Sequence, residues 1–268
     1  MARRWTTEEE NFYRNQLLEL YVKQNLTIAQ VGAILGIKEK TVFDRLERLA
    51  IPTNRKEKPG FNNQRKDIVL PEKSEKLAEF FGMMLGDGNL TKYQATVCLG
   101  SKEYDYVLYV QRLMSDLFKV SAHISTNKAG YHTVYIGSTQ VTDWMREQGF
   151  VPNKVAAQVG VPTWIMEKKE YMRGFVRGFF DTDGSVYKLR FGIQISITNC
   201  SMPLLVALQS MFRALDYRVS EISAYRIYVT RKKDVLRFFS DIAPQNIKHI
   251  ARFDKFKRRW WSGKHTTL

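Results

Sequence analysis

Two short segments that end in Asp-Gly carry the clearest chemical signal in the sequence. The stronger is Gly178-Phe-Phe-Asp-Thr-Asp-Gly184, and a looser copy, Gly82-Met-Met-Leu-Gly-Asp-Gly88, precedes it. Two buried carboxylates that lie side by side repel each other, so they need a cation between them. Carboxylate oxygens are hard ligands that Mg²⁺ and similar ions prefer. If Asp87 and Asp183 meet, the pattern therefore predicts a site for Mg²⁺ or another divalent cation such as Mn²⁺.

Paired glycines indicate how the two aspartates would meet. Each Asp-Gly ends a segment that is apolar nearly all round, and a helix of that kind must be buried. Gly82 and Gly86 are four residues apart, as are Gly174 and Gly178, so each pair lies on one helix face and lets another backbone approach. The bland alternative for either copy alone is an ordinary helix that ends in an Asp-Gly turn. Two copies with the same glycine-to-aspartate offset favour two helices that pack together and end at the same place.

These motifs resemble the paired motifs of LAGLIDADG homing endonucleases, in the single-chain form that carries both copies. The resemblance covers roughly residues 72 to 261, and Leu85 stands where an acid is often found. It implies that Asp87 and Asp183 are catalytic and hold metal, together with the backbone carbonyls of Gly86 and Thr182.

A lysine often follows the second strand in that family, and the two halves of this chain differ there. Lys102 stands at this place in the first half, so the resemblance implies that it offsets developing charge during catalysis. The matching place in the second half is Asn199-Cys200, without a lysine. This departure raises two alternatives to even double-strand cleavage, namely uneven cutting of the two strands and nicking.

The order of predicted elements gives the fold class and the domains. Each half follows the order αββαββα, so we expect an α+β fold with two four-stranded antiparallel sheets that form a saddle around the motif helices. A small all-α helix-turn-helix domain precedes them. The predicted boundaries are 1–52 for the helix-turn-helix domain, 53–71 for a basic linker, 72–160 for the first repeat, and 161–268 for the second repeat with a basic C-terminal tail.

The N-terminal domain offers one candidate surface for DNA. Residues 27–49 have two short helical faces around Gly36, as in a helix-turn-helix. Its second helix would expose to a major groove Lys40, Thr41, Asp44, Arg45 and Arg48. The alternative is a plain three-helix bundle with a solvated charged face.

The outer faces of the predicted sheets are a second candidate surface for DNA. Alternate side chains of a strand face opposite ways, so one face covers the helices and the other can follow a major groove. We expect about half of these polar candidates to touch DNA. In the first half they are Lys92, Gln94, Thr96, His123, Ser125, Lys128, His132 and Thr133, and in the second half Lys188, Arg190, Gln194, Ser196, Arg218, Ser220, Tyr225, Arg226 and Tyr228.

Composition agrees with a polyanionic partner. The 268 residues include 42 Lys and Arg against 27 Asp and Glu, a net charge of +15 and a pI near 9.7. The expected partner is double-stranded DNA with a long asymmetric site, bound by a monomer, with intron RNA as the alternative. We expect no membrane association, no signal peptide and a soluble cytoplasmic protein, with organellar expression as an alternative. The cysteines, Cys98 and Cys200, fit a reducing compartment, and we expect both to be buried.

Three functions remain open from the residues. The preferred one is a site-specific, metal-dependent endonuclease that cleaves double-stranded DNA. The second is a DNA-binding transcriptional regulator on the same scaffold, although retained metal ligands argue against it. The third is an RNA-splicing maturase, because a basic tail serves RNA equally well. The sequence does not identify the target site or say whether the gene lies in an intron.

Overall fold

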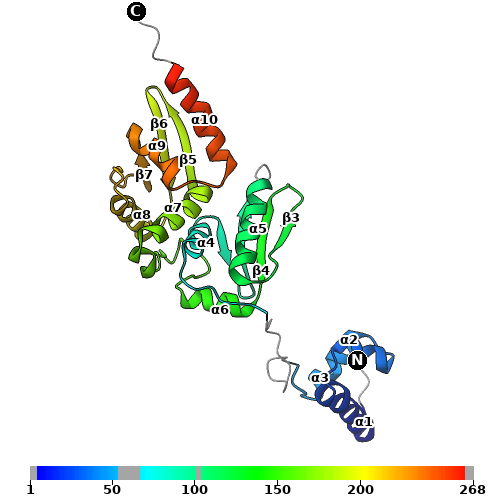
Figure 1. The fold of residues 1–268 in the computed structure, drawn as a ribbon. Helices are drawn as coiled ribbons and strands as arrows, with labels where there is room; N and C mark the ends of the chain where they lie inside the picture. The colour runs from blue at the N-terminus through cyan, green and yellow to red at the C-terminus, as the bar shows by residue number, and fades with distance from the viewer. Residues whose placement is uncertain (1–4, 54–66, 101–103, 263–268) are drawn as a thin grey trace, which may run out of the picture. The chain divides into compact units, whose positions relative to one another are not determined.

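The computed structural model describes residues 5–53, 67–100 and 104–262, with side chains up to residue 258 in the last helix. The chain divides into two compact units, 1–64 and 65–268 (Figure 1). The domain boundaries expected within and between these units stay predictions.

The first unit is a small helical bundle. Its elements are α1 (Thr7–Leu17), the π-helix η1 (Leu18–Lys23), α2 (Ile28–Leu35) and α3 (Glu39–Arg48). Gly36 ends α2 with φ of +63°, a left-handed conformation that glycine adopts without strain. The three residues between α2 and α3 make the tight connection that the sequence predicts. The buried core of this unit is Leu17, Tyr21, Val31, Val42, Leu46, Leu49 and Ile51.

In the second unit the first half has the predicted αββαββα order, and the second half has the same order with one strand fewer. The first half contains α4 (Glu75–Leu85), β1 (Gly88–Leu90), β2 (Gln94–Leu99), α5 (Tyr104–Phe118), β3 (His123–Thr126), β4 (His132–Gly137) and α6 (Thr139–Glu147). After a short 3-10 helix, η3 (Thr163–Glu167), the second half contains α7 (Lys169–Asp183), β5 (Gly184–Leu189), β6 (Gly192–Thr198), α8 (Met202–Ala214), β7 (Arg226–Val229), α9 (Lys232–Asp241) and α10 (Ile247–Ser262).

Each half contributes one antiparallel sheet, which confirms the α+β class. The first sheet has the order β1-β2-β4-β3 and the second β5-β6-β7. A fourth strand was expected over residues 218–222, and among the described residues this segment forms no regular strand. It still runs beside β7, because the Ser220 N–H donates to the Tyr228 carbonyl at 2.9 Å. The second sheet therefore has a looser edge than the first.

The motif helices α4 and α7 pack together through their glycines, as predicted. A Cβ on Gly82 would overlap the Phe175 carbonyl and lie 2.7 Å from the Phe179 nitrogen. A Cβ on Gly178 would overlap the Glu79 carbonyl. Because side chains are absent at these positions, the two backbones touch directly and the C-terminal ends of both helices arrive together.

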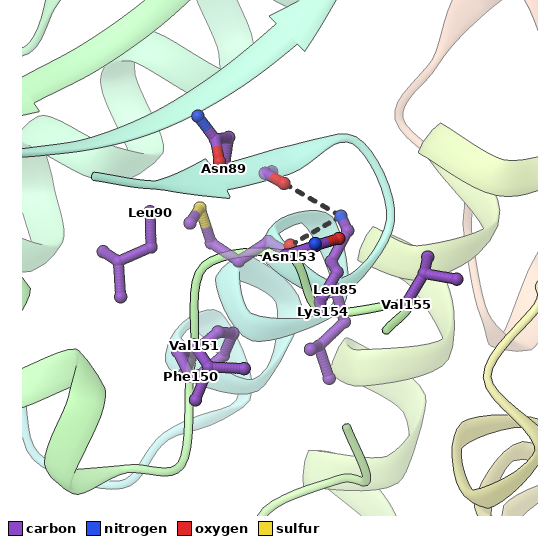
Figure 2. A pocket seen from close by; sticks show the side chains of 10 residues that line it. Leu85, Asn89, Leu90, Phe150, Val151, Asn153, Lys154 and Val155 are labelled. Carbon is purple, nitrogen blue, oxygen red and sulfur yellow. Dashed lines mark hydrogen bonds between the residues drawn. The ribbon is translucent and has the colours of Figure 1, made fainter. Parts of the chain in front are cut away.

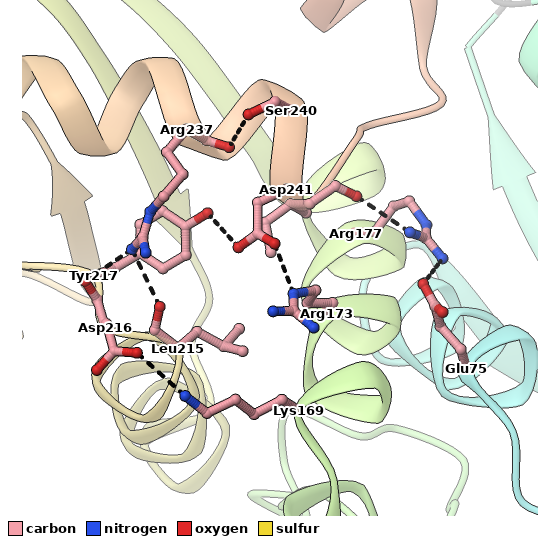
Figure 3. A network of polar contacts seen from close by, with 11 residues as sticks. Glu75, Lys169, Arg173, Arg177, Leu215, Asp216, Tyr217, Arg237, Ser240 and Asp241 are labelled. Carbon is pink, nitrogen blue, oxygen red and sulfur yellow. Dashed lines mark hydrogen bonds and ion pairs between the residues drawn. The ribbon is translucent and has the colours of Figure 1, made fainter.

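Polar contacts also hold α7 in place, against α4 on one side and against α9 on another (Figure 3). Toward α4, the Arg177 guanidinium donates to Glu79 at 2.9 Å and to Glu75 at 2.8 Å, and Glu79 is only 1% exposed. Toward α9, Arg173 donates to Asp241 at 2.7 Å. A buried charge is tolerated only when it is paired and hydrogen-bonded, so this network holds α7 in one orientation.

Asp181, the first acid of the second motif, anchors the C-terminal helix. Its carboxylate is buried and accepts the Gln245 N–H at 2.8 Å and the Asn246 N–H at 3.2 Å. Burial raises its pKa to about 8. The segment that leads into α10 is thereby tied to the end of α7, and α10 runs beside β5 and β6 (Figure 1).

The cysteine prediction was wrong. Cys98 and Cys200 are both exposed. On β2 the inward face is formed by Ala95, Val97 and Leu99, so Cys98 lies on the opposite, outer face. Among the described residues, none of the helices has the length and apolarity that a bilayer crossing requires.

Candidate functional site

The two motif aspartates come together at the ends of α4 and α7. A Cβ on Gly86 would overlap the Thr182 hydroxyl and lie 3.6 Å from the Asp183 carboxyl carbon. The backbone between α4 and Asp87 therefore faces Asp183 directly. Asp87 is exposed, and its carbonyl accepts the Cys98 N–H at 3.2 Å, which ties the start of the first hairpin to the end of β2.

A lysine that was not predicted reaches into this site. Lys154 lies in the segment that joins the two halves, and its ammonium group donates to the carbonyls of Met84 at 3.1 Å and Gly88 at 2.9 Å (Figure 2). It also donates to the carbonyl of Gly86. The Met84 carbonyl belongs to the last turn of α4 and those of Gly86 and Gly88 come just after it, at the helix end where the dipole favours a positive charge. The lysine also borders a pocket of about 200 Å³ lined by Leu85, Asn89 and Phe150 among others.

The electrostatics connect the lysine with both acids. Burial raises the pKa of Asp183 to about 6, and the Asp87 charge adds to this rise. The hydrogen bond from Asn199 and the charge of Lys154 oppose it. Burial lowers the pKa of Lys154, while the charges of Asp183 and Asp87 raise it. The site thus holds two acids and one base within electrostatic reach of one another.

The two halves support their acids differently. In the second half, the Asn199 amide donates to Asp183 at 2.9 Å, so the position that lacks the expected lysine still contacts the acid. In the first half, Lys102 was the predicted counterpart, and it lies outside the described residues. Beyond α9, the chain donates backbone N–H groups to Asp181, whereas the connection after the first half sends a lysine to the helix end. The site is therefore asymmetric.

The donor set fits a divalent metal. The groups present are the carboxylates of Asp87 and Asp183 and backbone carbonyls such as that of Gly86, which already accepts a cationic ammonium group. All are oxygens, as Mg²⁺ prefers. The described residues contain no cluster of three or more His, Cys, Asp or Glu side chains that could hold a metal alone. Mg²⁺ sites of one or two carboxylates are ordinarily completed by water and substrate phosphates.

Most sheet candidates lie where the sequence placed them, on exposed or half-exposed turns and outer strand faces. These are Lys92, Gln94, Lys128, Arg190, Gln194, Arg226 and Tyr228. Lys188 is exposed too, but it pairs with the buried Ile193 and shares the face of Val186, so it lies on the inner face of the sheet and not on the predicted outer face. Ser196 differs, because it is 4% exposed and pairs directly with Tyr228 in the β6–β7 register. A side chain so covered cannot reach a ligand without a rearrangement of its neighbours. In the first half, Thr96 is covered in the same way opposite Tyr135.

The predicted DNA face of α3 is only partly free. Lys40 is exposed and Thr41 half-exposed. The Arg45 guanidinium lies 4.0 Å from the centre of the Tyr13 ring, and Arg48 lies 3.9 Å from that of Trp5. Both arginines therefore stack on aromatic side chains of the N-terminal segment. Within this unit, Arg45 and Arg48 are partly committed to holding the bundle together.

Lys154 is the functional candidate that sequence reasoning missed. Residues 150–162 read as a connection between the halves, without a periodic pattern that places any side chain. One signal was available, because Lys154 is the single charged residue of that stretch. Only the tertiary structure brings it over the end of α4.

The fold and the site define a chain of two similar α+β repeats, with a four-stranded and a three-stranded antiparallel sheet, that meet through paired, glycine-bearing helices. Residues 170–243 match the family model of the LAGLIDADG-like domain, so this segment is a LAGLIDADG-like domain and the resemblance of its motif is confirmed. Among curated proteins, 117 residues are 28% identical to the replication factor C small subunit of Methanocaldococcus jannaschii. That match covers 43% of this chain and 6% of the length of that relative.

Three solved structures are similar to this chain at low sequence identity. I-DmoI in complex with DNA and Mn is 14% identical with a TM-score of 0.47, covering 63% of this chain and 96% of that one. Full-length DUF199/WhiA from Thermatoga maritima is 15% identical with a TM-score of 0.46, and the match covers 74% of this chain and 64% of that one. The I-SmaMI LAGLIDADG homing endonuclease bound to cleaved DNA is 12% identical with a TM-score of 0.42, and the match covers 69% of this chain and 88% of that one.

Proposed function

We propose that this chain is a site-specific DNA endonuclease that hydrolyses phosphodiester bonds with a divalent cation, Mg²⁺ or Mn²⁺. The observation that carries the proposal is the convergence of Asp87 and Asp183 at the shared ends of α4 and α7. A second carboxylate beside the half-buried Asp183 raises the free energy of the folded chain, and a structural role for the pair is not evident. The LAGLIDADG-like domain at residues 170–243 supports the same proposal.

The residues of the site have distinct roles in this proposal. Asp87 and Asp183, with the carbonyls of Gly86 and Thr182, would hold the cation. A bound divalent cation would polarise the scissile phosphate, activate water and stabilise the leaving oxygen. Asn199 orients the Asp183 carboxylate through its hydrogen bond. Lys154 supplies a fixed positive charge at the end of α4, where it would offset negative charge that develops on the phosphate.

The asymmetry of the site bears on strand choice. Lys154, from the segment that joins the two halves, donates to carbonyls of α4 and β1 in the first half, whereas Asp183 accepts a hydrogen bond from a neutral amide, that of Asn199. We therefore propose that the two strands are cut at unequal rates. The limiting case of this inequality is a nicking enzyme.

The partner is double-stranded DNA, approached from the outer faces of the two sheets by a monomer. Exposed basic side chains on those faces and at their turns, such as Lys92, Arg190 and Arg226, would contact phosphates, and the net charge of +15 favours a polyanion. We place the protein in the cytoplasm.

A selection experiment tests the proposal. The wild-type chain and the double variant Asp87→Asn, Asp183→Asn are each incubated with a library of random duplexes and Mg²⁺, and cut ends are sequenced on both strands. The wild type is expected to enrich one cut site, with unequal end counts for the two strands, and the double variant is expected to bind that site without cutting it. If both proteins bind one site and neither cuts, the chain is a regulator. If a structured RNA is bound more tightly than any duplex, the maturase alternative gains the support.

A further inference from the structure

Four β-hairpin turns in the described part of the second unit each present an exposed aromatic ring. The rings are Tyr93 at the β1–β2 turn, Tyr131 at the β3–β4 turn, Phe191 at the β5–β6 turn and Tyr225 before β7. Their exposed fractions are 57%, 56%, 83% and 52%. Single exposed apolar residues are common on protein surfaces. These four turns carry four of the six exposed aromatic rings in the described part of the second unit, the other two being Tyr104 and Tyr187.

A cationic side chain accompanies every ring. Lys92 precedes Tyr93 with its ammonium 5.3 Å from the ring centre, and Arg190 precedes Phe191 at 5.0 Å. The β3–β4 turn carries Lys128, and Arg226 directly follows Tyr225; both are exposed. Each turn thus combines a flat apolar surface with a positive charge. That combination matches the sugar and base surfaces of a nucleic acid beside its phosphates.

Hydrogen bonds hold two of the rings on rigid turns. The Thr91 hydroxyl accepts the Tyr93 N–H at 3.2 Å and the Gln94 N–H at 3.0 Å. The Asn127 side chain accepts the Tyr131 N–H at 3.0 Å. A ring on a braced turn loses little conformational freedom when it binds a partner, which favours affinity.

The turn at Tyr225 gives independent support, because its backbone conformation is strained for a residue with a large side chain. Ser223 and Arg226 exchange two backbone hydrogen bonds of 3.0 Å, so Ala224 and Tyr225 form a two-residue loop, with φ of +48° and +59°. Such a turn favours Asn-Gly, because most side chains are strained at positive φ. A bulky aromatic residue in this position points to a function that outweighs the strain.

The sheet registers place the rings at opposite ends of each sheet. Gln94, beside the β1–β2 turn, pairs with Gly137, whereas Leu99 pairs with His132 beside the β3–β4 turn. Leu189 pairs with Gly192 at one end of the second sheet, and Thr198 pairs with Arg226 at the other. A strand such as β2, with six residues, spans roughly 20 Å, about six base-pair steps of duplex.

We infer that these four turns are paired aromatic–cation contacts that grip the backbone of duplex DNA at the two ends of each sheet. Tyr131 and Tyr225 contact it at the end nearer to the acids, and Tyr93 and Phe191 contact it at the outer flanks. The contacts are independent of base sequence, because rings pack on any deoxyribose of the backbone and cations bind any phosphate. The inference rests on the proposed DNA-directed function and deepens it, since it assigns the residues that set the length of the contacted site.

The first test measures binding without chemistry. A fluorescein-labelled 40-base-pair duplex of mixed sequence is titrated by anisotropy in EDTA, across KCl concentrations, with wild type and with all four rings replaced by Ser. Affinity is expected to fall roughly tenfold or more without a change in its salt dependence, because rings release no counterions. Replacement of Lys92, Lys128, Arg190 and Arg226 by Gln should instead reduce the salt slope, by about 0.9 for each phosphate that is no longer neutralised.

Matched controls separate this inference from a general loss of fold. Met202→Ser, Val206→Ser changes two exposed apolar residues on α8, away from the turns, and should leave binding unchanged. The sharper variant is Ala224→Asn, Tyr225→Gly, which is expected to raise the thermal midpoint and yet weaken DNA binding about threefold. Ala224→Asn alone keeps the ring and should keep wild-type affinity.

Defined results overturn the inference. Wild-type affinity in the four-ring variant, or in the Asn-Gly variant, shows that the rings do not touch DNA. Tighter binding of the wild type to a structured RNA than to the duplex assigns the rings to RNA instead. The outcome is distinguishable from that of the proposed function. If the wild type binds DNA through its rings but never cuts, the endonuclease proposal is wrong and the inference about the rings stands. If the wild type cuts and the ring variants bind DNA as tightly as it does, the endonuclease proposal stands and the inference is wrong.

Discussion

At the scale of single residues, the site depends on how a few charges are placed relative to helix ends. Asp183 is the last residue of α7 and Asp87 lies two residues beyond α4, so both carboxylates stand at helix C-termini. A helix C-terminus disfavours negative charge, and here the two acids also disfavour each other. Lys154 offsets the first of these costs, because its ammonium group donates to the Met84 carbonyl in the last turn of α4 and to the Gly88 carbonyl just beyond it. A bound cation would answer the second.

Lys154→Met is the residue-scale prediction. Single-turnover cleavage of the selected duplex is expected to fall about 10²–10³-fold, because the phosphate loses a fixed positive charge as its own negative charge develops. Binding of the same duplex in EDTA should change little. Lys233→Met, on an exposed position of α9, is the matched control and should cut at the wild-type rate. Equal rates for both variants would remove Lys154 from the mechanism.

At the scale of elements, the paired helices fix where everything else lies. The glycine faces let α4 and α7 touch, and each helix leads directly into the first strand of its sheet. The buried Arg177–Glu79 pair then fixes the rotation of one helix against the other. The geometry of the acids is therefore a consequence of backbone contact, rather than of flexible side chains.

Gly82→Ala and Gly178→Ala test that contact. Each is expected to lower the free energy of unfolding by about 3 kcal/mol or more, because a Cβ there overlaps the backbone of the other helix, and overpacking costs about this much. Urea denaturation measures the change. Gly137→Ala is the control, since a Cβ at Gly137 meets nothing within 4 Å. Similar stabilities for all three variants would mean that the helices are held apart from each other.

The sequence predicted these elements better than it predicted the contacts of individual side chains. The periodic and glycine patterns gave the motif helices and the αββαββα order, because burial and backbone approach leave regular spacing in a sequence. The prediction of a fourth strand in the second sheet was wrong, because residues 218–222 lie at the edge of the sheet and can pair with only one neighbouring strand. Lys154 and the stacking of Arg45 on Tyr13 were missed because tertiary contacts of long side chains have no local pattern.

At the scale of the whole molecule, the C-terminal helix links the second motif to the stability of the fold. His249 of α10 is fully buried, its ring centre is 4.6 Å from that of Phe180, and Asp181 holds the segment before it. Burial, with smaller contributions from the charges of Lys248 and Arg252, lowers the pKa of His249 to about 3. The folded chain thus keeps this imidazole neutral at pH values where the unfolded chain protonates it.

His249 therefore predicts a pH dependence of stability. Its folded pKa lies below the unfolded value of about 6.5, so the stability it contributes is present above pH 6.5 and is lost as the pH falls toward 3. Between pH 7 and pH 5 the loss amounts to about 2 kcal/mol. Urea denaturation at pH 7 and pH 5 should show that His249→Leu loses less free energy of unfolding than the wild type, by about this amount. The same loss in both proteins would show that the buried ring does not titrate in this way.

The proposed mechanism depends most on a cation held between Asp87 and Asp183. The most direct measurement is an anomalous difference map of the chain crystallised with its selected duplex and Mn²⁺. The mechanism predicts a peak within about 2–2.5 Å of carboxylate oxygens of Asp87 and Asp183, with a DNA phosphate oxygen in the same shell. A map of a well-ordered complex with no peak near either carboxylate would contradict it.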